Sequence, residues 1–356
     1  MSESSPCIKV KKIHGEKALI SANKLEIINR EFKIHENASH IYVPLIRQPE
    51  ENELSTMKAQ LPDFELTTHV FTKKKQQRKT LLQTLENQLP PHLLASLPRA
   101  LDVIGDIAII EIPPELKAHE NIIGEAILAT HKTARTVLAK VGAVSGTYRL
   151  REFGFIAGES KTATIHKEYG CQYHVDVAKA YFSPRLSHEH SRVASFVQKG
   201  ETVVDLFAGV GPFSVLIAKK NAEAKVFAVD INPEAIEFLK RNIRLNRVEN
   251  QVIPILGDAR QVTEERLLGV ADRVIMNLPE KALEFIDAAC RAIKPSGGTV
   301  HYYAFIRLPD SLEKAQLRFS EAVEKAGRKV DAFLSAKTIR ATAPYEWQVV
   351  LDAKIL

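Results

Sequence analysis

The segment from Val203 to Ser214 constrains the fold of this chain more than any other stretch of the sequence. It reads Val-Val-Asp-Leu-Phe-Ala-Gly-Val-Gly-Pro-Phe-Ser, in which an apolar strand runs into a turn of small residues and then into the start of a helix. At the carboxyl edge of a parallel sheet, such a turn lets a ligand approach the backbone closely. A dinucleotide-binding turn would carry a third glycine where Ser214 stands, so NAD is disfavoured as that ligand.

Strand and helix patterns alternate from about His188 to the end of the chain, which predicts a doubly wound α/β sheet. The expected strands are 202–206, 225–229, 252–256, 273–276 and 299–305, and the expected helices are 212–219, 233–245, 282–293 and 311–326. Two last strands, 330–334 and 348–352, can pair antiparallel. We therefore expect a mixed sheet that a final hairpin closes at one edge.

The preceding residues predict two further regions, in keeping with a length of 356 residues. The first is a small α/β unit with strands at 7–10 and 40–45 and a helix at 16–30, followed by a polar linker or exposed arm from 47 to 80. The second contains helices at 81–88 and 122–140, a strand at 108–112, and an antiparallel meander of strands at 148–156, 162–167 and 172–177. The predicted domains are 1–70, 71–187 and 188–356.

Charge and cysteine content limit the class of protein. The formal net charge of +6 favours an anionic partner, and the run 73–79 holds five cations, which suit either phosphate contact or a solvated surface. Three widely spaced cysteines, Cys7, Cys171 and Cys290, form neither a metal clip nor an even disulfide framework, so we expect the reducing cytoplasm. The sequence shows neither a signal peptide nor an apolar run of about 18 residues, so no membrane contact is expected.

Three carboxylates stand at the ends of successive predicted strands. Asp205, beside Gly209 and Gly211, suits a ligand with an ammonium group, because a carboxylate and backbone carbonyls accept its hydrogen bonds. Asp230 is placed to accept two ribose hydroxyls, and Asp258 can accept a bond from the exocyclic amine of adenine. Any one of them alone is more often a helix cap or a surface charge. Together they describe a nucleoside with an amino-acid arm.

A further motif, Asn277-Leu278-Pro279, follows the strand 273–276 at the same edge of the sheet. The Asn277 amide offers a donor and an acceptor that can read a planar nitrogen heterocycle, and Pro279 stiffens the turn. An ordinary strand-to-helix turn is the alternative interpretation. The position next to the expected nucleoside site favours a nucleobase as substrate.

The segment from Thr202 to the C-terminus resembles the class I S-adenosylmethionine-dependent methyltransferases in its first motif and in the acidic residue after the second strand. Over nearly the whole chain, the sequence resembles the archaeal and eukaryotic tRNA methyltransferases that modify N1 of the guanine just 3′ of the anticodon. The motifs that carry this resemblance are Tyr148-Arg149, Thr164-Ile165-His166-Lys167-Glu168, Tyr181-Phe182-Ser183-Pro184-Arg185-Leu186 with Glu189, the segment Asp205 to Phe213, and Asn277-Leu278-Pro279.

The resemblance implies a cofactor, a partner and a set of site residues. The cofactor is S-adenosylmethionine, and the residues implied to contact it are Arg185, Asp205, Phe207, Gly209, Gly211, Asp230, Ile231, Asp258, Ala259 and Asn277. For catalysis and substrate binding it implies Arg149 on guanine O6, Glu189 as the general base for the N1 proton, Tyr181 holding the flipped base, and Asn277 with Pro279 completing the base pocket. The partner is tRNA, contacted through its anticodon arm and body by a monomer whose small N-terminal domain and α+β region bind RNA. No metal ligands are implied, and no feature decides whether Mg²⁺ takes part.

Three alternatives stay open at this point. A wyosine-pathway enzyme could use the same cofactor to transfer an aminocarboxypropyl group or to methylate a tricyclic guanine derivative. A non-catalytic RNA-binding protein could carry a degenerate cofactor site, although the intact aspartate and glycine set argues against it. A DNA adenine methyltransferase is disfavoured because Leu278 and Glu280 stand where its motif has a second proline and an aromatic residue.

Overall fold

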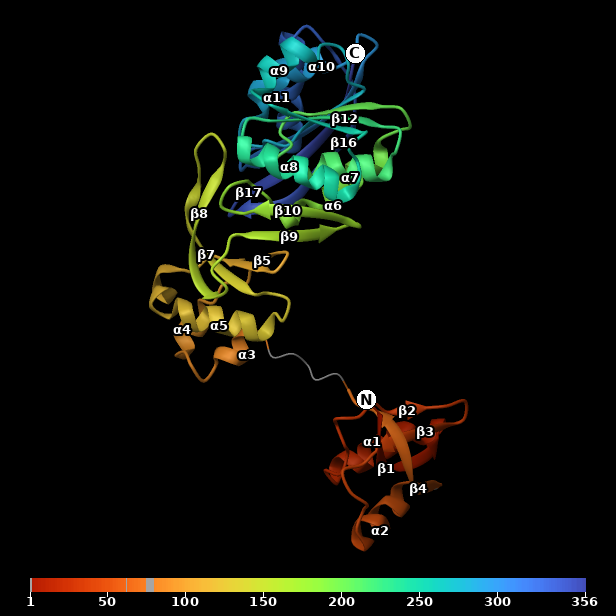
Figure 1. The fold of residues 1–356 in the computed structure, drawn as a ribbon. Helices are drawn as coiled ribbons and strands as arrows, with labels where there is room; N and C mark the ends of the chain where they lie inside the picture. Colours follow the sequence, from red (N-terminus) through yellow and green to blue (C-terminus); the bar gives the residue numbers. More distant parts are fainter. Residues whose placement is uncertain (1, 62, 75–79) are drawn as a thin grey trace. The chain divides into compact units, whose positions relative to one another are not determined.

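The computed structural model describes residues 2–61, 63–74 and 80–356 and divides the chain into two compact units, Met1–Lys79 and Thr80–Leu356 (Figure 1). The last strand of the first unit ends at Thr72, and the domain boundary at residue 70 stays a prediction. A division of the second unit near residue 187 stays a prediction. No helix in the described ranges is long and apolar enough to cross a membrane.

The first unit is a four-stranded antiparallel sheet with the order β2-β3-β1-β4. Its strands are β1 (Ser2–Lys11), β2 (His35–Glu36), β3 (His40–Pro44) and β4 (Phe64–Thr72), and its helices are α1 (Gly15–Lys24) and α2 (Glu51–Gln60). Both helices contribute to one apolar core with the sheet, through residues such as Ala18, Ala22 and Met57.

The linker predicted for residues 47–80 is wrong over most of its length. Residues 51–60 form α2, which a capping box of Glu50 and Glu53 starts, and residues 64–72 form β4 along the whole of β1. The polar composition misled the prediction because α2 buries only Met57 and β4 buries only Phe71. In the basic run 73–79, residues 75–79 lie outside the described residues, so phosphate contact by that run stays a prediction.

The second unit begins with three helices and a four-stranded sheet of order β5-β6-β7-β8. The helices are α3 (Leu81–Leu85), α4 (Pro91–Ala95) and α5 (Glu120–Thr130), and the strands are β5 (Leu101–Ile104), β6 (Ile107–Ile110), β7 (Thr136–Ser145) and β8 (Leu150–Gly158). The helix predicted for 122–140 is therefore wrong after residue 130, because residues 136–139 pair in parallel with β6. The predicted meander is split, since β9 (Ala163–Glu168) and β10 (Cys171–Asp176) form a separate two-stranded sheet.

The predicted mixed sheet is confirmed as a seven-stranded sheet of order β13-β12-β11-β14-β15-β17-β16. The strands are β11 (Thr202–Asp205), β12 (Lys225–Asp230), β13 (Val252–Leu256), β14 (Arg273–Met276), β15 (Gly298–Arg307), β16 (Val330–Ala343) and β17 (Glu346–Ile355). The first five in this order pair in parallel, whereas β17 lies antiparallel between β15 and β16. The strand order reverses between β11 and β14, and ligands of such sheets bind at that point.

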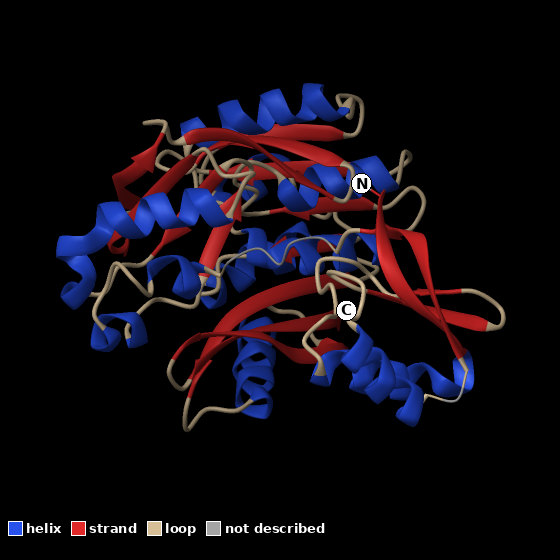
Figure 2. Ribbon diagram, turned by 90° about the horizontal axis from the view of Figure 1, so that it is seen from below, coloured by secondary structure: helices blue, strands red, loops and turns tan. Residues whose placement is uncertain are grey.

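Helices cover both faces of this sheet (Figure 2). Successive residues of β11 point to opposite faces of the sheet and enter different apolar cores. Val203 packs with residues of α6 (Ser187–Phe196), α7 (Pro212–Lys220) and α8 (Pro233–Asn246). Val204 packs with residues of α9 (Ala259–Arg266), α10 (Ile286–Ala292) and α11 (Leu312–Lys325). Two buried layers hold the strands in register, so the loops at their carboxyl ends are presented from a rigid base.

Candidate active site

One cavity of about 190 Å³ lies at the carboxyl ends of four neighbouring strands of the seven-stranded sheet. Each of these strands contributes residues at its carboxyl end or directly after it. The contributions are Leu206, Phe207 and Gly209 from β11, Asp230, Ile231 and Asn232 from β12, Gly257, Asp258 and Ala259 from β13, and Asn277, Leu278 and Pro279 from β14. We call this space the inner cavity.

The two glycines of the turn after β11 have different roles. Gly209 has φ +57°, lines the inner cavity, and donates its N–H to Asp230 Oδ2 at 2.7 Å. Gly211 has φ +91° and is the N-cap of α7, where a Cβ atom would come within 2.4 Å of Leu239 Cδ1. Only glycine tolerates both the backbone angle and this close approach. Gly209 therefore faces the ligand space, and Gly211 sets the packing behind it.

Asp230 is held rigidly at the wall of the inner cavity. Its second oxygen, Oδ1, accepts the N–H of Asn232 at 2.9 Å, so each carboxylate oxygen already has one backbone donor. Burial raises the pKa of Asp230 above its usual range, and these backbone donors oppose the shift. Each oxygen retains a lone pair, which leaves the group able to accept the hydroxyls of a ribose.

Asp258 caps a helix and also lines the inner cavity. Its Oδ1 caps α9 by accepting the N–H groups of Arg260 at 2.9 Å and Gln261 at 3.3 Å. The same side chain lines the inner cavity, and the cap does not use Oδ2. Phe207 and Phe285 line the cavity as well, with ring centroids 5.1 Å apart in an edge-to-face pair. A carboxylate beside apolar rings fits a purine.

Asp205 does not line the inner cavity but is fully buried at the end of β11. Ser214 Oγ donates to its Oδ2 at 2.8 Å, whereas Oδ1 has no hydrogen-bond partner among the described residues. Burial raises the pKa of Asp205 to about 7, and the hydrogen bond from Ser214 opposes this shift. A buried acceptor without a partner is costly, and a cationic ligand group nearby would lower that cost.

The residues expected to hold a base meet at the other wall of the inner cavity. Arg149, at φ +56° in the turn between β7 and β8, places its Nη1 2.7 Å from Glu280 Oε2, and its guanidinium lies 5.5 Å from the Tyr181 ring. Both side chains line the cavity together with Asn277 and Pro279. Asn277 Oδ1 is buried and has no partner among the described residues, as expected of an atom that awaits a ligand.

Besides Asp205 and Gly211, two further residues expected in the site do not line the inner cavity: Arg185 and Glu189. Arg185 Nε lies 2.5 Å from Asp102 Oδ1, and the side chain lines an adjoining wider cavity instead. Glu189 is buried on α6, one turn after Leu186, which does line the inner cavity. The structure thus brings together most of the predicted site and places these two side chains next to it.

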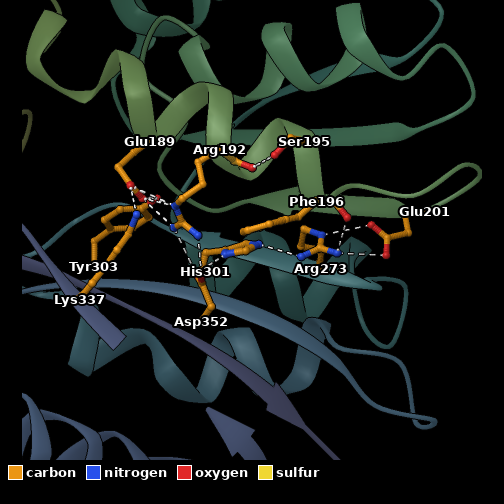
Figure 3. A network of polar contacts seen from close by, with 10 residues as sticks. All are labelled: Glu189, Arg192, Ser195, Phe196, Glu201, Arg273, His301, Tyr303, Lys337 and Asp352. Carbon is orange, nitrogen blue, oxygen red and sulfur yellow. Dashed lines mark hydrogen bonds and ion pairs between the residues drawn. The ribbon is translucent and has the colours of Figure 1, made fainter. Parts of the chain in front are cut away.

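Glu189 lies in a network of polar contacts beside the site (Figure 3). Arg192 donates to both of its carboxylate oxygens, with the shortest contact at 2.6 Å. Lys337 Nζ lies 3.0 Å from Oε1, and the Tyr303 hydroxyl donates to Oε2 at 3.2 Å. Burial raises the pKa of Glu189, but the bonds from Arg192 and Lys337 outweigh it and leave the pKa below its usual range. The carboxylate is therefore ionised.

The network continues along the sheet from Arg192 (Figure 3). Arg192 Nη1 lies 2.5 Å from Asp352 Oδ2, and Asp352 Oδ1 lies 2.5 Å from His301 Nδ1. Arg273 Nη1 contacts His301 Nε2 at 2.9 Å and also pairs with Glu201. Although burial raises the pKa of Asp352, the bonds from His301 and Arg192 lower it to about 2. Charged residues inside otherwise apolar strands were the only signal that the sequence offered for this network.

The inner cavity is also lined by residues that we did not predict. They include Phe305 on β15, Arg340 on β16 and Gln348 on β17. Among the described residues, no group of His, Cys, Asp and Glu side chains could hold a metal ion.

The order of the sheet, the glycine turn and the carboxylates of the inner cavity define a class I S-adenosylmethionine-dependent methyltransferase. Sequence-family comparison agrees: residues 164–331 match the TRM5/TYW2 methyltransferase domain, residues 81–162 the TYW2 N-terminal domain, and residues 7–53 the tRNA methyltransferase 5 N-terminal domain.

Individual relatives point to the same group. The chain is 48% identical over 267 residues to the tRNA (guanine(37)-N(1))-methyltransferase Trm5b of Pyrococcus abyssi, covering 75% of this chain and 78% of the relative. It is 37% identical over 355 residues to Trm5b of Methanocaldococcus jannaschii, covering 98% of both chains. The chain belongs to the TRM5/TYW2 methyltransferase family.

Solved structures match over the full length. The crystal structure of Trm5b from Pyrococcus abyssi has a TM-score of 0.74 at 38% identity and covers 99% of both chains. A complex of aTrm5 with tRNALeu has a TM-score of 0.74 at 35% identity and covers 98% of this chain and 99% of that one. In contrast, the tRNA 4-demethylwyosine(37)-methyltransferase Taw21 of Saccharolobus solfataricus, 33% identical, covers 78% of this chain and 99% of its own length.

Proposed function

We propose that this chain transfers a methyl group from S-adenosylmethionine to N1 of guanine 37 in tRNA. The observation that carries the proposal is the alignment with Trm5b of Methanocaldococcus jannaschii, which runs through both units and covers 98% of each chain. The wyosine-pathway relative Taw21 is matched over 99% of its length by 277 residues of this chain, so it is too short to hold counterparts of both complete units. The first unit thus favours the guanine methyltransferase over that alternative.

The inner cavity supplies the groups that S-adenosylmethionine requires. When bound, this cofactor supplies an electrophilic methyl group on a sulfonium. Asp230 would accept hydrogen bonds from the ribose hydroxyls, and Asp258 Oδ2, which the helix cap does not use, would hold the adenine together with the Phe207 and Phe285 rings. The buried Asp205 provides negative charge for the methionine ammonium, and the main chain at Gly209 allows close approach.

Arg149, Tyr181, Asn277 and Pro279 form the guanine site within this proposal. The amide of Asn277, whose Oδ1 has no partner among the described residues, reads the edge of the base. As N1 loses its proton, negative charge spreads to O6, and the Arg149 guanidinium is the complementary charge. Its present partner Glu280 is half exposed, so that ion pair is weak enough for a substrate to displace.

Glu189 takes the N1 proton in this mechanism. Its lowered pKa keeps it ionised but makes it a weak base as long as both cations contact it, and Leu186, which directly precedes α6, lines the inner cavity. Arg192 is buried and holds the carboxylate in place, whereas Lys337 is 38% exposed and is the partner that can move aside. Arg185, on the wider cavity, fits contact with the RNA backbone near the base better than contact with the cofactor.

The base of nucleotide 37 must leave its stack to enter the inner cavity, at a cost of a few kcal/mol. That cost requires further contacts with the RNA, for which the first unit and the wider cavity are the candidates. Contact with the anticodon arm, a monomeric state, a cytoplasmic location and any use of Mg²⁺ stay predictions of the sequence.

Methylation of two tRNA transcripts that differ only at position 37 tests the proposal. We expect label from methyl-labelled S-adenosylmethionine in the G37 transcript and none in the A37 transcript. A parallel reaction with cofactor labelled in its carboxyl group detects aminocarboxypropyl transfer, which we expect to be absent. Equal methylation of both transcripts would refute the base assignment, and carboxyl label in the RNA would establish the wyosine-pathway alternative.

A further inference from the structure

The inner cavity opens into a wider, strongly charged cavity of about 830 Å³. Four residues line both spaces and form their common rim: Arg149, Tyr181, Phe305 and Arg340. The wider cavity is lined by six cationic side chains and four carboxylates. A nucleotide whose base enters the inner cavity must therefore leave its sugar and phosphates at this rim or just outside it.

The sheet itself places Arg340 on the rim. Phe305 on β15 pairs with Gln348 on β17, and Gln348 pairs with Arg340 on β16, so the three side chains stand in one row on the same face. Register shifts lie on both sides of Arg340, between Thr338 and Arg340 and between Ala341 and Ala343. A register shift changes the direction in which the neighbouring side chain points, and β-bulges, one form of such a shift, are common beside active sites.

Arg340 is fixed in orientation but its charge is not compensated. Its Nε donates to Oε1 of Gln348 at 3.0 Å, and Gln348 is only 2% exposed, which makes it a rigid anchor. Arg149, the other arginine on the rim, pairs with Glu280. Within the described ranges, no carboxylate lies at ion-pair distance from Arg340, and its two Nη groups donate no hydrogen bond. A fixed guanidinium with a free Nη edge is suited to bidentate contact with an anion.

We propose that Arg340, anchored by Gln348, binds the backbone phosphate next to the target nucleotide while the base occupies the inner cavity. This inference rests on the proposed function, because it takes the occupant of the inner cavity to be a base of an RNA. A phosphate fits better than a base edge, since the inner cavity already supplies Arg149 and Asn277 for the base. Arg340 would then hold the flipped nucleotide without reading its sequence.

The test compares the RNA affinity of wild type and Arg340→Gln as a function of salt concentration. Loss of one phosphate contact on a single-stranded segment lowers the slope of log K against log[salt] by about 0.7, and the affinity should fall about tenfold. We expect the same loss for G37 and A37 transcripts. Arg244→Gln, which removes an exposed cation of α8 outside both cavities, is the matched control and should leave the slope unchanged.

Transcripts with a neutral methylphosphonate on either side of nucleotide 37 identify the contact. Wild type should lose affinity for one of these transcripts, and Arg340→Gln should show no further loss with that transcript. If Arg340→Gln proves too unstable to purify, Arg340→Lys replaces it: the retained charge should preserve the salt slope and the sensitivity to methylphosphonate. A wild type that is insensitive to both substitutions overturns the inference.

Three further outcomes would also overturn it. Loss of affinity for the G37 transcript alone would show that Arg340 reads the base. Loss of S-adenosylmethionine binding in the absence of RNA would show that Arg340 belongs to the cofactor site. An unchanged salt slope in Arg340→Gln would show that no phosphate is bound. Failure of wild type to methylate the G37 transcript refutes the proposed function itself, which is a separate result.

Discussion

Replacing Asp205 by asparagine tests whether the buried carboxylate at the end of β11 carries a large energetic cost. Its pKa is raised from an ordinary 3.8 to about 7 because the group is fully buried. Between these two pH values the folded protein retains a proton that the unfolded chain releases, so the free energy of unfolding decreases as the pH rises. From pH 5 to pH 7, two pH units correspond to a loss of about 3 kcal/mol as an upper value.

An asparagine at position 205 keeps the shape of the side chain and can still accept the Ser214 hydroxyl bond, but it does not titrate. We therefore expect Asp205→Asn without cofactor to lose less stability than wild type between pH 5 and pH 8. Urea denaturation at intervals of one pH unit measures the difference. Glu324→Gln, on the exposed side of α11, is the control and should follow the wild-type profile.

Cofactor binding should offset the energetic cost of ionising the buried Asp205 carboxylate. The ammonium and sulfonium groups of S-adenosylmethionine favour the ionised carboxylate, so the affinity of wild type for the cofactor should increase between pH 5 and pH 7. Asp205→Asn should lack that increase. If the variant and the wild type show the same pH dependence of stability, the buried carboxylate does not titrate in this range and the reasoning is wrong.

Substitutions at four other site residues give contrasting outcomes, with Gly170→Ala as a control. Asp230→Asn should weaken cofactor binding about tenfold, as measured by calorimetry, because both oxygens of the wild-type carboxylate accept backbone N–H groups. Asp258→Asn should fold normally, because the helix cap at this residue uses only one oxygen. Gly211→Ala should lower the free energy of unfolding by about 2 kcal/mol, because the new Cβ would come within 2.4 Å of Leu239 on α8. The control Gly170→Ala has a similar φ but open space around its Cβ, so its free energy of unfolding should fall by only about 1 kcal/mol. Equal losses in the two variants would show that the contact with Leu239 costs nothing. Glu189→Gln should reduce the single-turnover rate at least about 100-fold and stability by about 3 kcal/mol, with unchanged cofactor affinity. An unchanged rate at saturating tRNA would remove Glu189 from the reaction.

Local patterns predicted the cofactor side of the site. Asp230 ends its strand, and Asp258 and Asn277 follow theirs within two residues. Because the carboxyl ends of parallel strands meet at one edge, spacing along the chain was sufficient to bring the three residues together. The structure places all three in the inner cavity.

Long-range pairing was the information that the sequence lacked. Residues 136–139 fit a helix pattern as well as a strand, and their parallel pairing with β6 decided the outcome. In the same way, α2 and β4 expose most of their surface, so their composition resembled a linker.

The surroundings of Glu189 and Arg340 escaped prediction for a similar reason. Arg192 pairs with Asp352, which lies 160 positions along the chain, and no local motif marks such a contact. The row of Phe305, Gln348 and Arg340 depends on the register of three strands and on two register shifts within β16. Neither the register nor the position of such a shift can be derived from a strand pattern alone.

Mass analysis of nucleosides from a G37 tRNA transcript, after reaction with the purified protein and S-adenosylmethionine, tests the assigned reaction most directly. We predict 1-methylguanosine, located at position 37 by fragment analysis, and no aminocarboxypropyl product. A methyl group on another atom or another nucleotide, or a complete absence of modified guanosine, would contradict the assignment.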